Sequence, residues 1–250
     1  MSTATPAKQP AAPEPKGRVV PSPVAIHDTP AAKAVSFGRP ALLGALLLLR
    51  FGALVRDPVS ALQTALPVVA VIQAAYLVLC VPVAGSPAVK AAKKARPGEK
   101  KRPEAGTPNS VVTAILSLLL TALVTPAVYI LFILFGAPFL DHVSHTFLCA
   151  AHFSLLGVYP VFYARGVDAQ AMLAVAGAYA PLDETFGGLL GSLFGAWLGA
   201  VPIPLDWDRE WQKWPVTIIV GLYLGHAVGS KLIGTLFYGR AITLAESKED

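Results

Sequence analysis

The sequence predicts an all-α membrane protein, a bundle of six transmembrane helices that follows a disordered cytoplasmic tail. Of its 250 residues, 54% are hydrophobic and only 14% are charged, whereas soluble domains carry about 25% charged residues. The apolar residues gather in long runs, and a membrane-spanning helix needs about 20 mostly apolar residues. Most Lys and Arg residues lie between these runs, as expected of loops outside the membrane.

Composition divides the chain into three predicted regions. Residues 1–39 are rich in Pro and Ala and offer almost nothing to bury, so we expect a disordered tail. Residues 40–240 hold the apolar segments and form the membrane domain, which is interrupted by a basic loop at 85–109. Residues 241–250 are polar and form a C-terminal tail.

Six apolar segments are candidates for membrane spans. The first is short and contains Arg50, which must extend to the interface or face the bundle. Pro67 and Pro126 are expected to kink the second and third spans. The apolar piece 169–180 is too short to span. The predicted spans are 40–55, 59–84, 111–135, 139–163, 182–201 and 214–238.

The distribution of Lys and Arg predicts the orientation, because cytoplasmic loops collect these residues. With six spans, both tails and the loops 85–109 and 164–181 share one side and carry fifteen of the twenty Lys and Arg residues. Both termini are therefore predicted to be cytoplasmic, and residues 202–215 to lie on the lumenal or outer face. The basic loop has no interleaved aromatic residues to stack on bases, so no nucleic acid is expected. The other side has three basic residues outside the spans: Arg56, Arg209 and Lys213.

Glycine recurs at every fourth position in the last two spans. In lipid, helices associate through close packing, and small residues let their backbones approach. A glycine costs about 1 kcal/mol in a soluble helix, so its repeated use predicts a contact that more than offsets this cost. The contact is either between these two spans or with a partner protein. The glycines are Gly187, Gly191, Gly195, Gly199, Gly221, Gly225 and Gly229.

The stretch between these spans, PIPLDWDREWQKWP, is short, charged and rich in tryptophan. Tryptophan rings suit the membrane–water boundary. Its two aspartates are a conceivable Mg²⁺ site, but no nucleophile or phosphate cradle accompanies them, so anchoring or partner contact is favoured. The predicted site residues of this loop are Pro202, Pro204, Asp206, Trp207, Asp208, Arg209, Trp211 and Trp214.

The segment DHVSHTFLCAAH, residues 141–152, places metal-ligand residue types on one sector of a helix. A metal site would need further ligands from elsewhere, and the pattern lacks the Glu of HExxH. We therefore favour histidines that hydrogen-bond between helices, with the acid at the helix start complementing the dipole. A polar contact to a partner or lipid headgroup, and a metal site, are alternatives. No metal or other cofactor is predicted. The polar cluster comprises Asp141, His142, His145 and His152.

The carboxylates Asp183 and Glu184 are expected to form a solvated helix start on the cytoplasmic side. Further along, GAWLGAVPIPLDWDREWQKWP at 195–215 resembles the signature of the Pig-F family of the GPI-anchor biosynthesis pathway. FGAPFLDH at 135–142 and the layout of six spans are also similar to that family. The resemblance is strong over 182–238 and moderate over 110–165.

The resemblance implies a function. Pig-F proteins are multi-pass proteins of the endoplasmic reticulum membrane. They are non-catalytic partners of the large transferases that add ethanolamine phosphate to the GPI mannoses, and they stabilise those acting on the third and second mannose. The resemblance thus implies an accessory subunit, not an enzyme. Its partners would be the large catalytic subunits and membrane lipid, with the GPI precursor as one candidate. The alternative is a membrane-embedded enzyme or lipid transporter that uses helix 141–152.

Overall fold

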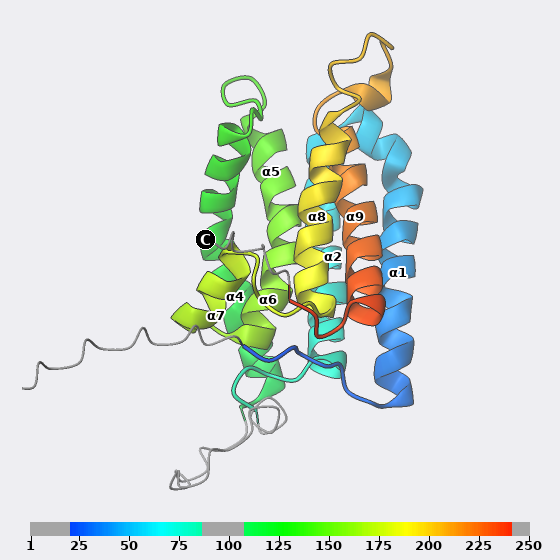
Figure 1. Cartoon of the computed structure of the whole chain (residues 1–250). Helices are drawn as coiled ribbons and strands as arrows, with labels where there is room; N and C mark the ends of the chain where they lie inside the picture. The colour runs from blue at the N-terminus through cyan, green and yellow to red at the C-terminus, as the bar shows by residue number, and fades with distance from the viewer. Residues whose placement is uncertain (1–20, 87–107, 242–250) are drawn as a thin grey trace, which may run out of the picture.

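The computed structural model describes residues 21–86 and 108–241, which are helical apart from turns and one isolated β-bridge. The long helices run side by side (Figure 1). A π-helical turn, η1 (Ser154–Val158), joins α5 to α6. A short 3₁₀ turn, η2 (Glu210–Gln212), lies before α9. The helices are α1 (Pro30–Arg56), α2 (Pro58–Cys80), α4 (Ser110–Leu134), α5 (Val143–Phe153), α6 (Tyr159–Arg165), α7 (Ala169–Ala176), α8 (Glu184–Ala200) and α9 (Val216–Leu236).

By length and composition, five helical segments of the described chain can cross a membrane: α1, α2, α4, the continuous α5–η1–α6 segment, and α9. The chain is therefore a membrane protein with several spanning helices. Helix α8 has 17 residues and is shorter than the roughly 20 residues of a typical span. Because α8 lies alongside α9 (Figure 1), we keep it as a proposed sixth crossing.

The first span begins earlier than predicted. Helix α1 starts at Pro30, not at residue 40, so the predicted boundary of the disordered tail was wrong. The Thr29 side chain accepts a hydrogen bond from the Ala32 amide at 3.1 Å, and proline at the first helical position fits the helix without losing a bond. Residues 1–20, most of the basic loop, and residues 242–250 lie outside the described residues, so the predictions for them stay predictions.

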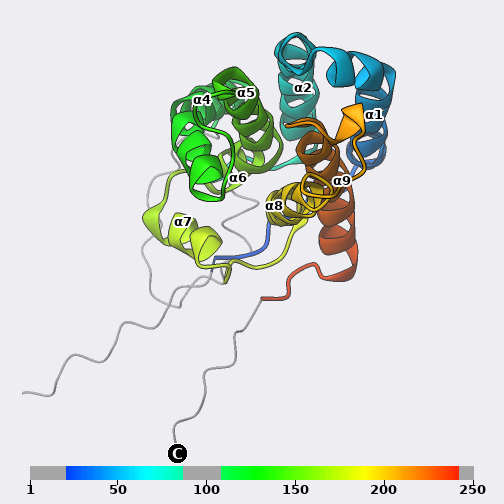
Figure 2. The same ribbon diagram turned by 90° about the horizontal axis from the view of Figure 1, so that it is seen from above.

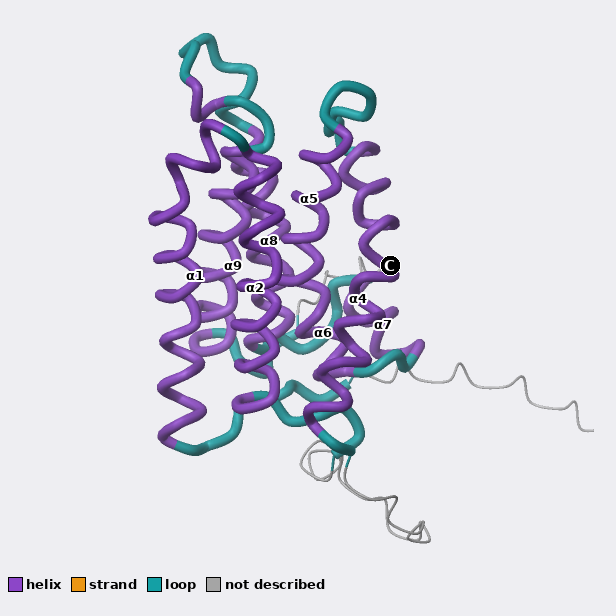
Figure 3. The backbone as a smooth tube through the Cα atoms, turned by 180° about the vertical axis from the view of Figure 1, so that it is seen from behind, coloured by secondary structure: helices purple, strands orange, loops and turns teal. Residues whose placement is uncertain are grey.

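The two ends of the described chain meet at one end of the bundle. The His27 amide donates to the Cys80 carbonyl at 2.8 Å, and the Leu182 amide donates to the Arg240 carbonyl at 2.7 Å. The loop 201–215 lies at the opposite end, as does the loop between α4 and α5 (Figure 3). We call these the terminal end and the tryptophan end. This arrangement is what an even number of crossings produces.

Viewed from above, α4, α5 and α6 form one group, while α1, α2, α8 and α9 form another (Figure 2). The groups meet where α2 contacts α5 and where α8 contacts η1 and α6. The core between them is fully buried and includes Tyr76, Leu156, Tyr159 and Leu222.

The π-helical turn gives Gln73 of α2 its function. A π turn displaces the regular ladder of backbone hydrogen bonds, so carbonyl groups are left for other donors. The Gln73 amide nitrogen approaches the Leu155 carbonyl at 3.2 Å and the Leu156 carbonyl at 3.3 Å. Gln73 is fully buried. It therefore joins α2 to the centre of the α5–α6 span, where no water is present to replace it.

We predict that Gln73→Leu destabilises the bundle by about 1–3 kcal/mol, because buried carbonyls lose their donor. The measurement is the free energy of unfolding of the purified protein in detergent. Gln63→Leu is the matched control, since Gln63 lies on the same helix but is exposed. Equal stability of the two variants would contradict this account of Gln73.

Candidate functional site

The glycines of α8 and α9 face each other. A Cβ atom at Gly191 or Gly195 would overlap a carbonyl oxygen of α9, and one at Gly229 would lie 2.5 Å from the carbonyl oxygen of Gly187. Side chains larger than hydrogen are therefore excluded, and the two backbones touch. The contact lies within the chain. Four pairs face each other: Gly187 with Gly229, Gly191 with Gly225, Gly195 with Gly221, and Gly199 with Thr217.

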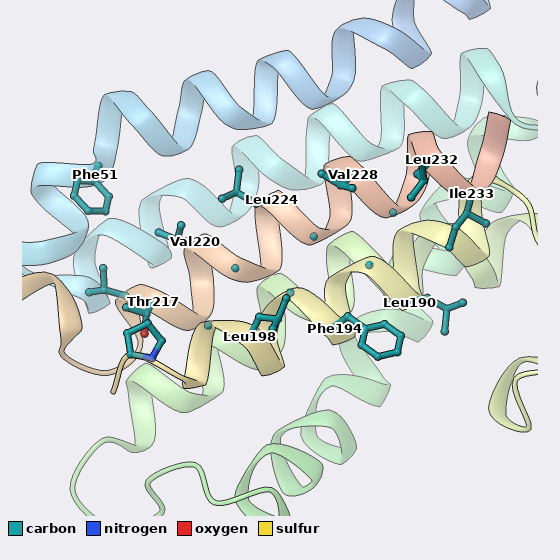
Figure 4. A pocket seen from close by; sticks show the side chains of 18 of the residues that line it. Phe51, Leu190, Phe194, Leu198, Thr217, Val220, Leu224, Val228, Leu232 and Ile233 are labelled. Atoms are coloured by element: carbon teal, nitrogen blue, oxygen red, sulfur yellow. The ribbon is translucent and has the colours of Figure 1, made fainter. Parts of the chain in front are cut away.

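An apolar groove of about 910 Å³ follows this contact on its outer side. Figure 4 shows large side chains along both of its edges, among them Phe194 from α8 and Leu224 from α9, with Phe51 of α1 at one end. We call it the seam groove. The glycine spacing creates this groove, because the close approach of the two helices leaves bare backbone between two rows of side chains.

The loop at the tryptophan end is organised by Gln212, which the sequence analysis did not select. The Gln212 amide nitrogen donates to the carbonyls of Pro202 and Leu205, each at 2.6 Å. Its side-chain oxygen accepts from the Arg209 amide at 3.1 Å. Gln212 is buried, so this one side chain satisfies three backbone groups and fixes the shape of the loop.

The predicted site residues of the loop do not form one pocket. The rings of Trp207 and Trp211 are in tilted contact, with centroids 5.8 Å apart, and these residues are 53% and 36% exposed. Such exposure suits rings at a membrane boundary. Trp214 instead packs against the hydrophobic core. The charged residues of the loop are exposed, as are Pro204, Asp206 and Asp208. Pro202 lines the seam groove.

The structure separates the predicted polar cluster. His152 is fully buried, and its ring nitrogens lie 2.8 Å from the Tyr223 hydroxyl and 3.1 Å from the Leu62 carbonyl oxygen. It therefore connects α5 to α9 and α2. His142 and His145 form a separate edge-to-face pair near the tryptophan end, with ring centroids 4.9 Å apart. Asp141 is exposed in the loop before them. Within the described residues, no group of three or more His, Cys, Asp or Glu side chains is placed to hold a metal ion.

Glu184 is the centre of a buried ionic cluster near the terminal end. Its carboxylate lies 3.1 Å from the Arg39 guanidinium and 2.7 Å from the Lys231 ammonium group. The Ser36 hydroxyl donates to both carboxylate oxygens, at 3.0 and 2.9 Å, and Lys231 also donates to Ser36. One carboxylate thus joins α1, α8 and α9.

Helix α2 completes the ionic cluster through Arg39. The Arg39 guanidinium donates to the Gln73 side-chain oxygen at 3.3 Å and lies over the Tyr76 ring, 3.7 Å from its centroid. Arg39 is 2% exposed. A cation this deeply buried requires such partners, because an unpaired charge away from water is costly.

The neighbouring Asp183 serves a second set of partners. One carboxylate oxygen accepts from the amides of Thr185 and Phe186, both at 3.0 Å, and so caps α8. The other accepts from the Val24 amide at 3.0 Å and pairs with Arg165. Asp183 is fully buried.

The expectation that Asp183 and Glu184 form a solvated helix start was therefore wrong. Arg39 and Arg165, which were counted among cytoplasmic loop charges, are buried in the same region. A signal was available, because charged residues inside apolar segments predict partners within a bundle. The sequence does not show which cation meets which carboxylate, since the partners come from distant helices.

The family model described as the GPI biosynthesis protein family Pig-F matches residues 39–234. The chain belongs to the Pig-F family. The match begins at Arg39 and includes Glu184 and Lys231 of the ionic cluster, the glycines and the tryptophan loop, whereas Ser36 precedes it. The resemblance seen in the sequence is confirmed, and a role in GPI biosynthesis follows from the family.

Curated relatives agree with membership of Pig-F. The "Glycosylphosphatidylinositol anchor biosynthesis protein 11" of Neurospora crassa is 58% identical over 218 residues, which cover 87% of this chain and 80% of that protein. The protein of the same name from Aspergillus fumigatus is 39% identical, covering 96% and 92%. The Mus musculus "GPI ethanolamine phosphate transferase, stabilizing subunit" is 37% identical over 105 residues, covering 40% and 48%. No solved structure is significantly similar to the chain.

We predict that Glu184→Gln lowers the free energy of unfolding by about 3–5 kcal/mol, because it leaves two buried cations without their anion. Glu210→Gln is the matched control. Glu210 pairs with Lys213 at 2.5 Å on the exposed loop, where an ion pair contributes only about 0–1 kcal/mol. The measurement is unfolding of both purified variants in the same detergent. If both are equally stable, the ionic cluster does not hold the helices together.

Proposed function

We propose that this Pig-F protein is a non-catalytic subunit that stabilises the GPI ethanolamine-phosphate transferases acting on the third and second mannose. Family membership combined with the printed name of the mouse relative carries the proposal. The large catalytic subunits would be its partners, and the endoplasmic reticulum membrane its location, as the pathway implies. Both termini would face the cytoplasm, with the tryptophan end in the lumen.

The geometry supports a structural role. Several buried polar side chains, among them His152, Gln73 and Glu184, hydrogen-bond to side chains or backbone groups of other helices. Such bonds fix how helices pack. Asp206 and Asp208, the carboxylates considered for a metal, are exposed on one short loop, whereas catalysis needs a preorganised site from which water is excluded.

A partner would meet the outer faces of the bundle. In the apolar stretches of α1 and α4, only 17% and 22% of the residues are buried within the chain. Most of the surface of these helices is therefore left for lipid or for the membrane helices of a transferase. The glycines do not contact a partner directly, because they form the contact between α8 and α9. They set the shape of the helix pair that a partner or lipid encounters.

The direct test is purification from gentle detergent, followed by mass spectrometry of the proteins recovered. We predict a large ethanolamine-phosphate transferase at near-equal amount. A stable protein recovered alone in repeated preparations would contradict the proposal. Assays of the isolated protein for metal binding and lipid turnover would then examine helix 141–152.

We also predict that Gly195→Leu lowers both the cellular abundance and the co-purification of the transferase several-fold, because a side chain there separates α8 from α9. Ala176→Leu on α7 is the control, since Ala176 is exposed and lies outside the seam and outside α1 and α4. Quantitative blotting of the transferase in cells carrying each variant is the measurement. Unchanged transferase in the Gly195→Leu cells would exclude this role of the seam.

A further inference from the structure

The seam groove has the size and position of a lipid site. Its volume of about 910 Å³ lies in the range of about 300–1,000 Å³ found for small-molecule sites. It extends from Thr217 and Trp211 at the tryptophan end to Ile233 and Phe237 near the terminal end. Thr217 to Ile233 corresponds to about 24 Å of helix at 1.5 Å per residue. One leaflet is about 15 Å deep, half of the hydrocarbon core, so an acyl chain fits along it.

The cross-section of the groove favours a thin ligand. Its floor is the glycine backbone, and its edges include Phe194 and Leu198 from α8 and Leu224 and Val228 from α9 (Figure 4). The helices touch, so the space between their rows of side chains is narrow. A partner helix is about 10 Å wide with its side chains and would rest on the edges. A single hydrocarbon chain can reach the floor.

One polar group marks the end of the groove. Thr217 lines it at the tryptophan end, is only 8% exposed, and its hydroxyl has no hydrogen-bond partner within the described residues. Other buried threonines differ, because Thr121 and Thr125 donate to the carbonyl four residues earlier, at 2.7 and 2.8 Å. Ser154 and Tyr163 also have buried hydroxyls without a partner, but among such residues of the described chain Thr217 is the one that lines the groove. A buried hydroxyl of this kind requires an explanation.

We infer that the seam groove binds a bilayer glycerophospholipid. One acyl chain lies along the glycine floor. Its ester carbonyl accepts a hydrogen bond from the Thr217 hydroxyl once that side chain, whose oxygen is covered in this structure, rotates toward the groove. Ester carbonyls lie at the boundary between hydrocarbon and headgroups, and Trp211, which also lines the groove, is the residue type that settles at that boundary. This inference goes beyond the proposed function and holds whichever transferase is bound.

The first test maps lipid contacts on the full-length protein. The protein is placed in phosphatidylcholine nanodiscs that contain a phosphatidylcholine with a diazirine in one acyl chain, and labelled peptides are identified by mass spectrometry. We expect labelling of the groove edges at least fivefold above that of the exposed face of α4. Val228→Trp should lower groove labelling at least threefold, whereas Leu123→Trp, on that α4 face, should not. Even labelling of both faces would overturn the inference.

The second test examines the hydroxyl. Unlabelled diacyl and dialkyl-ether phosphatidylcholines compete with the probe, and only the diacyl lipid carries an ester carbonyl. We expect the diacyl lipid to compete about threefold to tenfold better on the wild type, which is the range of one neutral hydrogen bond. Thr217→Val should abolish the preference. Thr235→Val should keep it, because the Thr235 hydroxyl donates to the Lys231 carbonyl, away from the groove. A preference that survives in Thr217→Val overturns the assignment.

Transferase co-purification is measured on the same variants, so that loss of lipid and loss of partner are distinguished. A Thr217→Val protein that keeps its transferase but loses the ester preference supports the lipid site by itself. The remaining outcome is a groove closed by a partner. If Val228→Cys forms a cross-link to a transferase helix and lipid labelling disappears in the complex, the groove is a helix-docking surface and the lipid inference is wrong.

Discussion

Backbone contact between α8 and α9 is the constraint on which the rest of the structure depends. It requires glycine at successive turns of both helices, because any Cβ atom on this face meets the opposite backbone. The contact brings Glu184, at the start of α8, beside Lys231 of α9. It also holds α8 against the α5–α6 span, where Leu189 lies against Gly157. The groove on the outer side is a direct result, since two helices in backbone contact leave bare glycine between their rows of side chains.

The ionic cluster and the glycine contact solve different problems. Glycine packing holds one helix pair through van der Waals contact. This contact does not depend on the hydrophobic effect, which does not drive helices together in lipid. The ionic cluster joins helices that are distant in sequence, and it does so with long side chains that reach across the bundle. Arg39 and Lys231 share one carboxylate, that of Glu184. The Gln73 side-chain oxygen and the Tyr76 ring further stabilise the Arg39 cation, and Ser36 donates a hydrogen bond to the carboxylate. Pairing of this kind is weak evidence of high stability, because the cost of removing the charges from water offsets their attraction.

Much of the architecture could be predicted because hydropathy and glycine spacing are local patterns. The apolar segments correspond to helices, and the glycines lie at a helix contact. The start of α1 was missed because Ser36 and Arg39 look like tail residues until Glu184 is placed beside them. Gln73 and Gln212 were missed for a related reason: their partners are backbone carbonyls whose availability depends on a π turn and on a loop conformation. The polar cluster was predicted from one helix, yet the contacts of His152 come from two others.

The position of Glu184 also bears on the order in which the protein is built. A ribosome makes the chain from its N-terminus, so Arg39 enters the membrane with α1 long before the carboxylate that neutralises it has been synthesised. Until α8 arrives, α1 and α2 hold a charge that only Gln73 and Tyr76 accompany. The early helices cannot reach their final packing during this interval. The ionic cluster is therefore completed only when the C-terminal helix pair is in place, because α8 supplies the carboxylate and α9 the second cation.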